Sequence, residues 1–159
     1  MSIRVATRED LPFLTQMLFD AFFWSPDQAR PALQVFLQNP EFRKLLADWG
    51  RAGDSAVVAE AAGAPIGAAW YRYWTAAHHS YGFVDAATPE LGIGVRAGYR
   101  SHGTGRALLR ALVEMARQAG VPTLSLSVDP SNFALRLYES EGFQKVGESG
   151  TSWTMVLAL

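Results

Sequence analysis

A run of arginine, serine, histidine and glycine between a short apolar segment and a long amphipathic one has the composition of an anion-binding loop. The first N–H groups of a helix have no partner within the helix and carry a partial positive charge. Glycine lets an anion approach such groups closely. The residues that would hold a pyrophosphate are Arg100, Ser101, His102, Gly103, Thr104, Gly105 and Arg106. A tight strand-to-helix turn that requires glycine for its own geometry is the alternative.

Two other phosphate-binding motifs fit the chain poorly. It has no G-x-x-x-x-G-K-[ST] stretch, which argues against a P-loop. Gly92, Gly94 and Ala97 spell G-x-G-x-x-A, but they lie within an expected strand rather than after it. A nicotinamide-dependent oxidoreductase is therefore a weaker interpretation.

Two segments resemble the GNAT superfamily of N-acetyltransferases. Arg100-x-x-Gly103-x-Gly105 matches the R/Q-x-x-G-x-G/A signature of that superfamily. The segment VDPSNFALRLYESEGF is similar to its second recurring segment, with Asn132, Ala134, Leu137, Tyr138, Gly142 and Phe143 in register. The order of elements fits from Ile3 to Leu159. The resemblance implies a GNAT fold and acetyl-CoA as cosubstrate.

The resemblance also implies roles for single residues. Backbone groups of Ile93, Gly94 and Val95 would bind the pantetheine arm, where glycines suit a bulge, and the loop from Arg100 to Arg106 would bind the pyrophosphate. Asn132 would contact the cofactor, and Tyr138 would lie near its sulfur as general acid. Taken without the resemblance, Asn132 is a helix-start residue and Tyr138 an ordinary half-buried aromatic.

The general base is less firmly indicated. An amine must be neutral to attack a thioester, so a carboxylate or histidine is needed to take its proton. Glu90 is the first candidate, because some family members place a glutamate near this point of the strand; a solvent-facing carboxylate is the alternative. Other members carry a glutamate in the next strand, where this chain has Ser127, which puts a protein N-terminal amine acceptor in doubt.

The two histidines before this strand do not suggest a metal. His78 and His79 are adjacent, so on an extended segment they point to opposite sides. The chain has no cysteine and no spaced carboxylate near them. We expect no metal site, and exposed loop histidines are the simpler interpretation.

The resemblance leads to one functional hypothesis. We expect an N-acetyltransferase that moves an acetyl group from acetyl-CoA to a primary amine of a small molecule or peptide, by direct attack in a ternary complex. A non-catalytic acyl-CoA-binding or sensing domain is the alternative. Aromatic side chains that would line an acceptor pocket, or fill the core, are Phe22, Phe23, Trp24, Tyr71, Tyr73 and Trp74.

Composition narrows the partners and the compartment. The chain of 159 residues carries a net charge of -1 and no cysteine, so we expect no nucleic-acid partner and no disulfide. No apolar run approaches the ~20 residues of a membrane span, and the charged start MSIRVATRED does not suit a signal peptide. We expect a cytoplasmic protein. The apolar end WTMVLAL suits a homodimer contact and core burial equally.

The pattern along the chain predicts a single mixed α/β domain over residues 1–159. Its sheet would have about six to seven strands with flanking helices, and strands would splay at the acetyl-CoA site. Thr7 and Asp10 predict a capping box before a first helix, and residues 27–39 and 40–50 predict one or two shorter helices. The predicted strands are Ile3–Thr7, Ala56–Glu60, Ile66–Trp74, Glu90–Val95, 122–128, 143–148 and 152–159. The predicted later helices are Thr104–Gln118 and 131–142, and the strand–helix–strand unit from Leu91 to Val128 predicts a parallel crossover.

Overall fold

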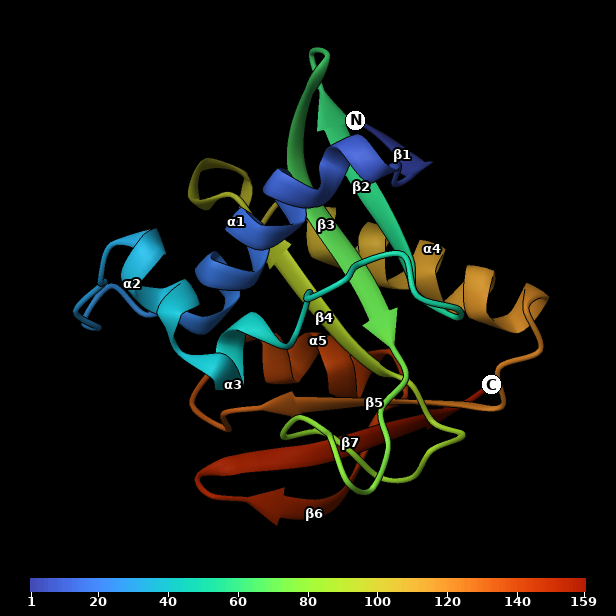
Figure 1. The fold of residues 1–159 in the computed structure, drawn as a ribbon. Helices are drawn as coiled ribbons and strands as arrows, with labels where there is room; N and C mark the ends of the chain where they lie inside the picture. Colours follow the sequence, from blue (N-terminus) through green and yellow to red (C-terminus); the bar gives the residue numbers. More distant parts are fainter. The chain divides into compact units, whose positions relative to one another are not determined.

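The computed structural model describes residues 1–159 and has a mixed α/β fold. Seven strands form a sheet in the order β1-β2-β3-β4-β5-β7-β6 (Figure 1). They are β1 (Ser2–Val5), β2 (Ser55–Ala61), β3 (Ala64–Arg72), β4 (Glu90–Val95), β5 (Thr123–Val128), β6 (Gln144–Ser149) and β7 (Ser152–Ala158). The helices are α1 (Leu11–Phe22), α2 (Leu33–Gln38), α3 (Pro40–Arg43), α4 (Thr104–Gln118) and α5 (Ala134–Ser140), with short 3-10 turns η1 (Arg8–Asp10) and η2 (Ala97–Tyr99). This confirms the predicted fold class.

The chain divides into two compact units. Unit 1 holds residues 1–70 and 92–112, and unit 2 holds residues 71–91 and 113–159. The predicted bounds of β4 and α4 are confirmed. The parallel crossover is also confirmed, because β4 and β5 pair in parallel with Glu90 opposite Ser125.

The start of unit 1 is fixed by one carboxylate. Asp10 accepts a hydrogen bond from the backbone N–H of Thr7 at 2.7 Å, which confirms the capping box. The guanidinium of Arg4 on β1 donates to both oxygens of Asp10, at 2.7 and 2.8 Å. Mainly through this hydrogen bond from Arg4, the pKa of Asp10 falls to about 2. The entry into α1 is therefore tied to the first strand of the sheet.

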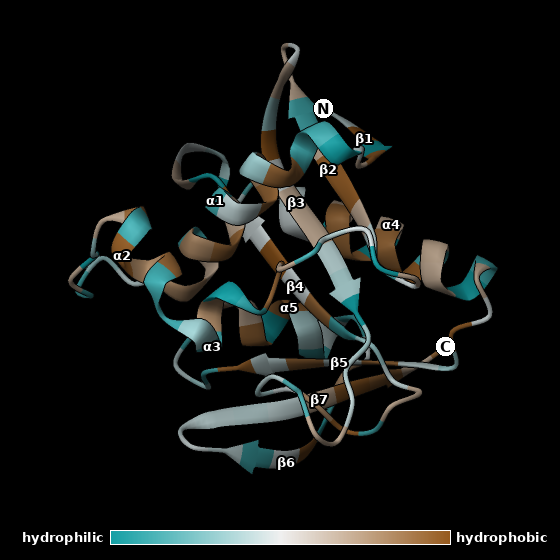
Figure 2. Ribbon diagram, in the orientation of Figure 1, coloured by the Kyte–Doolittle hydropathy of each residue, from teal (hydrophilic) through white to brown (hydrophobic).

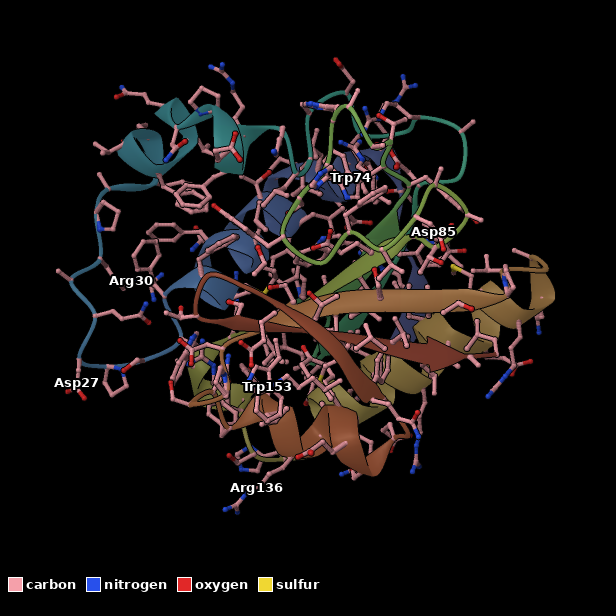
Figure 3. All side chains as sticks on the ribbon, turned by 90° about the horizontal axis from the view of Figure 1, so that it is seen from below. Asp27, Arg30, Trp74, Asp85, Arg136 and Trp153 are labelled. Atoms are coloured by element: carbon pink, nitrogen blue, oxygen red, sulfur yellow. The ribbon has the colours of Figure 1, made fainter.

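An aromatic core joins α1 to the two short helices after it. Phe36 of α2 contacts Phe19 and Phe22 of α1 and Phe23 directly after it, and its ring stacks on Phe42 of α3 at 4.6 Å. These rings fill the space between the helices with apolar surface that would otherwise face water. Arg30, labelled in Figure 3, comes from the connection between α1 and α2 and pairs with Asp20 at 2.6 Å.

The helices predicted over 27–39 and 40–50 are shorter than expected. The α2 helix begins at Leu33, after Pro31, because a proline disfavours helix at the residue before it. Pro40 starts α3, where the side chain of Asn39 accepts from the N–H of Glu41 at 3.0 Å. The α3 helix ends at Arg43, and turns follow up to Gly50, whose φ is +109°.

The hairpin β2–β3 turns on two residues rather than the predicted five. Ala62 and Gly63 have φ values of +52° and +78°, and such a pair of left-handed residues is what a tight two-residue hairpin requires. The β3 strand begins at Ala64 and ends at Arg72, two residues earlier at each end than predicted. Figure 2 shows much of β2 in brown, which agrees with its buried side chains.

Unit 2 contains the antiparallel strands β5, β7 and β6. The β5 and β7 strands pair from Thr123 opposite Ala158 to Val128 opposite Trp153. The β6 strand forms one edge of the sheet and has a register shift between Lys145 and Gly147. The ammonium of Lys145 lies 4.3 Å from the ring centre of Trp153, which Figure 3 labels. A charged side chain and a register shift both discourage pairing of this edge with another strand.

Candidate functional site

The connection from β4 to α4 has the backbone of an anion-binding loop. Ser101 and Gly103 have φ values of +64° and +84°, so the chain turns through two left-handed residues before the helix. The first helical hydrogen bond runs from the N–H of Ala107 to the carbonyl of Gly103. The N–H groups of the first helical turn lie at the positive end of the helix dipole, which suits this end of α4 to bind an anion.

Gly103 is required for its conformation rather than for space. A Cβ added there would have no heavy atom within 4 Å, so the space beside this glycine is open. Thr104 is buried, whereas Ser101 and His102 are exposed and Gly105 and Arg106 are half-buried. The loop predicted to hold a pyrophosphate thus has an accessible backbone at the start of α4.

The two glycines inside β4 allow close packing of neighbouring elements. A Cβ on Gly94 would collide with the backbone carbonyl of Met17 in α1, and a Cβ on Gly92 would lie 2.7 Å from the ring of Trp70. Real Cβ atoms do not come this close to other heavy atoms. The α1 helix therefore lies directly on β4, and only glycine permits the contact.

The backbone groups of β4 point in alternating directions. The N–H of Arg96 donates to the carbonyl of Ile66 on β3 at 2.9 Å, so this residue faces β3. Gly94, two residues earlier, faces the same way, and its carbonyl lies 3.1 Å from the Cβ position of Gly67 on β3. The N–H and C=O groups of Ile93 and Val95 therefore point away from β3. Of the three residues predicted to bind pantetheine, these two have backbone groups on the edge of β4 that faces away from β3.

The side chain of Arg100, the arginine of the signature, donates hydrogen bonds to backbone carbonyls of unit 1. The Nε of Arg100 donates to the carbonyl of Val95 at 3.0 Å, and its Nη1 donates to the carbonyl of Trp24 at 3.4 Å. Trp24 follows the last residues of α1. This contact is not predictable from the sequence, because the two residues are far apart in the chain.

Tyr138 and Asn132 belong to unit 2. Tyr138 lies on α5, is buried, and packs edge-on against Phe143 with ring centres 5.8 Å apart. Burial raises the pKa of Tyr138 to about 12, so its hydroxyl stays protonated. The side chain of Asn132 accepts from the N–H of Ala134 at 2.9 Å. The Oδ1 of Asn132 therefore holds the first residue of α5, while Phe133 occupies the N-cap position.

Glu90 holds the loop between β3 and β4. Its Oε2 accepts from the backbone N–H of Gly82 at 3.1 Å. A Cβ on Gly82 would lie 2.8 Å from the carbonyl carbon of Leu126 and 2.9 Å from the carboxyl of Glu90, so only glycine fits between them. Ser125, opposite Glu90 in β5, is fully buried, and its hydroxyl oxygen has no hydrogen-bond partner. Glu90 is thus half-buried among backbone groups rather than a solvent-facing carboxylate.

A sequence model of the Acetyltransferase (GNAT) family matches residues 13–143. That range covers both the loop before α4 and the segment around Tyr138. The chain belongs to the GNAT acetyltransferase family. The similarity that the sequence indicated is thereby confirmed.

Individual relatives agree with this assignment. A stretch of 55 residues is 49% identical to the N-alpha-acetyltransferase RimI of Mycobacterium tuberculosis, and it covers 35% of this chain and only 34% of that protein. The ribosomal-protein-alanine N-acetyltransferase of Brucella melitensis has a similar structure, with a TM-score of 0.70, 28% identity and 100% of both chains covered. The PaiA N-acetyltransferase of Thermoplasma acidophilum, solved with coenzyme A, shares the fold, with a TM-score of 0.74, 19% identity and 100% of both chains covered.

The remaining candidates of this GNAT chain have structural contacts. His78 packs edge-on against Trp74, and the ring of His79 stacks on Phe83 at 4.5 Å while its Nδ1 lies 2.8 Å from the carbonyl of Ser80. The structure has no group of three or more His, Cys, Asp or Glu side chains placed to hold a metal ion. It also has no helix with the length and apolar character needed to cross a membrane.

The aromatic residues suggested for an acceptor pocket mostly fill space. Phe22 and Phe23 belong to the aromatic core of α1–α3, and Tyr71 and Trp74 are buried. Tyr73 is half-buried, and this burial raises the pKa of its hydroxyl. The core interpretation is the one these contacts favour in this GNAT chain.

Proposed function

We propose that this GNAT chain transfers an acetyl group from acetyl-CoA to a primary amine of a small molecule or peptide, by direct attack in a ternary complex. The observation that carries the proposal is the open backbone loop at the start of α4, with left-handed Ser101 and Gly103. A negatively charged pyrophosphate complements the N–H groups and the partial positive charge at the start of a helix. Acetyl-CoA supplies the activated thioester.

The residues of unit 1 suit two parts of acetyl-CoA, the pyrophosphate and the pantetheine arm. Backbone N–H groups from Ser101 to Arg106 would hold the pyrophosphate. The edge groups of Ile93 and Val95 would bind the amide-bearing pantetheine arm, because amides pair with an open strand edge as a neighbouring strand does. Gly94 contributes by letting α1 approach β4 rather than by binding. In unit 2, Asn132 retains its amide nitrogen for a further contact, since its Oδ1 holds the helix start.

Tyr138 would act as the general acid. Its raised pKa of about 12 keeps the hydroxyl protonated throughout the neutral range, so it can donate a proton to the departing sulfur. Its burial against Phe143 restricts the ring, which favours a fixed direction for the donated proton.

Glu90 would act as the general base, directly or through water. Its Oε2 accepts from Gly82, and this contact orients the carboxylate. An oriented carboxylate can take the proton that a lysine-like amine must lose before attack. A purely structural Glu90, which anchors the loop through Gly82, is the competing role.

The names of the relatives and the residue at position 127 both bear on which class of amine is the acceptor. The names of the Mycobacterium and Brucella relatives describe acetylation of an α-amine and of a ribosomal protein alanine. A peptide or protein amine is therefore the first acceptor class to test. Ser127 stands where some family members carry a glutamate, so small-molecule amines stay in the proposal.

A panel of amines tests the proposal through released coenzyme A. The panel contains peptides with free N-terminal alanine or serine, the same peptides with blocked N-termini, free amino acids, polyamines and aminoglycosides. Turnover that requires a free primary amine supports the proposal. Tight acetyl-CoA binding by calorimetry without turnover of any amine would favour the non-catalytic sensing domain instead. Absence of acetyl-CoA binding would refute both.

A further inference from the structure

The guanidinium of Arg100 lies on backbone carbonyls rather than in the open loop. Its Nε donates to Val95 at the end of β4, and its Nη1 donates to Trp24 beyond the end of α1. The side chain is half-buried. Its backbone, in contrast, leads into the left-handed residues Ser101 and Gly103 that precede α4. The backbone of Arg100 thus leads into the anion-binding loop, whereas its side chain bonds to the end of β4 and to the segment after α1.

The carbonyl that Arg100 holds belongs to the edge of β4 that faces away from β3. Arg96 bonds to Ile66 of β3, so the backbone groups of Val95 point away from β3. Arg100 takes one of the two lone pairs of the Val95 carbonyl from that side. The guanidinium therefore fixes the orientation of the peptide groups to which a pantetheine arm would bind.

The second contact extends this arrangement to the segment after α1. A guanidinium is planar and presents its donors in a rigid fork, so one group can hold two carbonyls in a defined geometry. Lysine offers a single ammonium on a flexible stem and cannot reproduce the fork. Together with Gly94, which admits the backbone of Met17, Arg100 ties β4 to both the middle and the end of α1.

We propose that Arg100 is a positioning residue that fixes the β4 edge for the pantetheine arm and ties it to Trp24, and that its charge does not bind the pyrophosphate. This inference rests on the proposed use of acetyl-CoA. It separates two roles that the signature motif does not distinguish. A residue that binds the pyrophosphate affects the reaction only with acetyl donors that carry a pyrophosphate. A residue that shapes the β4 edge affects the reaction with every acetyl donor that has a pantetheine arm.

The test compares acetyl-CoA with acetyl-pantetheine, which lacks the pyrophosphate and the nucleotide. The variants are Arg100→Lys, which keeps the charge, Arg100→Met, which keeps the chain length, and Arg8→Met as an exposed arginine control. Both Arg100 variants should lower kcat/KM by a similar factor with both donors, roughly 10- to 100-fold for the loss of charge-assisted hydrogen bonds. The dependence of acetyl-CoA binding on salt should stay as in the wild type, because no phosphate contact is lost.

Other results overturn the inference. Near-normal acetyl-CoA use by Arg100→Lys, together with a loss in Arg100→Met that is confined to acetyl-CoA and flattens its salt dependence, would assign Arg100 to the pyrophosphate. Variants that match Arg8→Met with both donors would also refute it.

If the Arg100 variants do not fold, a measurement on the wild-type protein still tests the inference. The Nε–H of Arg100 should exchange slowly with solvent in the free protein, because it already bonds to Val95. Fast exchange that slows only with coenzyme A would contradict the inference. Wild-type protein that binds neither donor refutes the proposed function itself, while the exchange measurement still reports on Arg100.

Discussion

The backbone N–H of Gly82 donates a hydrogen bond of 3.1 Å to Oε2 of Glu90, and the two residues lie so close that no side chain fits on Gly82. This contact gives the proposed base a fixed orientation. It also gives Glu90 a structural task, the anchoring of the loop before β4. Activity and stability measurements on one substitution can separate the two tasks.

Glu90→Gln keeps an oxygen for the N–H of Gly82 but removes the negative charge. If Glu90 is the base, the rate should fall most near neutral pH and recover at high pH, where free amine is already present. The measurement is a profile of kcat/KM between about pH 6 and about pH 10. A profile parallel to that of the wild type, at unchanged melting temperature, removes Glu90 from the mechanism.

Gly94→Ala should destabilise unit 1 because the new methyl group meets the backbone carbonyl of Met17. Backbone cannot move aside as a flexible side chain can, so we expect a loss of roughly 1–3 kcal/mol or more in the free energy of unfolding. Gly98→Ala is the matched control, since a Cβ there has no atom within 4 Å. Denaturant unfolding of both variants checks the prediction, and equal stabilities would show that α1 does not press on β4.

Gly103→Glu should weaken acetyl-CoA binding steeply while the fold survives. The space beside Gly103 is open, but its φ of +84° disfavours a side chain by about 1 kcal/mol. The added carboxylate would repel the pyrophosphate. Gly103→Ala carries the same backbone cost without the charge, so calorimetry on the pair isolates the electrostatic part. Equal affinities in Gly103→Glu and Gly103→Ala would place the pyrophosphate elsewhere.

Tyr138→Phe removes a proton donor and keeps the ring that packs on Phe143. The melting temperature and the acetyl-CoA affinity should change little, and kcat should fall within the ~10²–10⁴-fold range typical of a lost general acid. Because the pKa of Tyr138 is about 12, deprotonation of this residue should not limit the wild-type rate at pH values well below 12. Steady-state kinetics paired with direct binding provide the check. Weaker binding at an unchanged kcat would make Tyr138 a binding residue.

Asp10 should make the stability depend on acid pH. Its pKa is lowered from 3.8 to about 2 in the folded chain, so its contribution is present above about pH 4 and is lost as the pH falls towards 2. We expect ~1–2 kcal/mol, since Arg4 is partly exposed and solvent screens the pair. Unfolding free energies of wild type and Asp10→Asn between about pH 5 and about pH 2 should converge as the pH falls. A constant difference would show that the charge of Asp10 does not stabilise the fold.

The sequence by itself determined the elements whose signals are local. The periodic apolar positions of α4, the glycine-rich approach to it and the capping box at Thr7 and Asp10 each lie within a few residues, so their bounds were predictable. The signature around Arg100 and the segment around Tyr138 likewise indicated the family. Less local signals failed: α2 and α3 are short because two prolines and the aromatic core set their limits, and the hairpin turn depends on a left-handed Ala62.

Only the tertiary structure decided what the individual side chains do. The guanidinium of Arg100 bonds to Trp24, which is far away in the chain, and position 94 must be glycine because the backbone of Met17 on α1 lies against it. Glu90 is held by Gly82, and the rings of Phe22 and Phe23 pack against rings from α2 and α3. Such roles depend on distances between segments that are remote in sequence. A one-dimensional pattern contains residue types and spacings, but the close approach of two backbones arises only when the chain is folded.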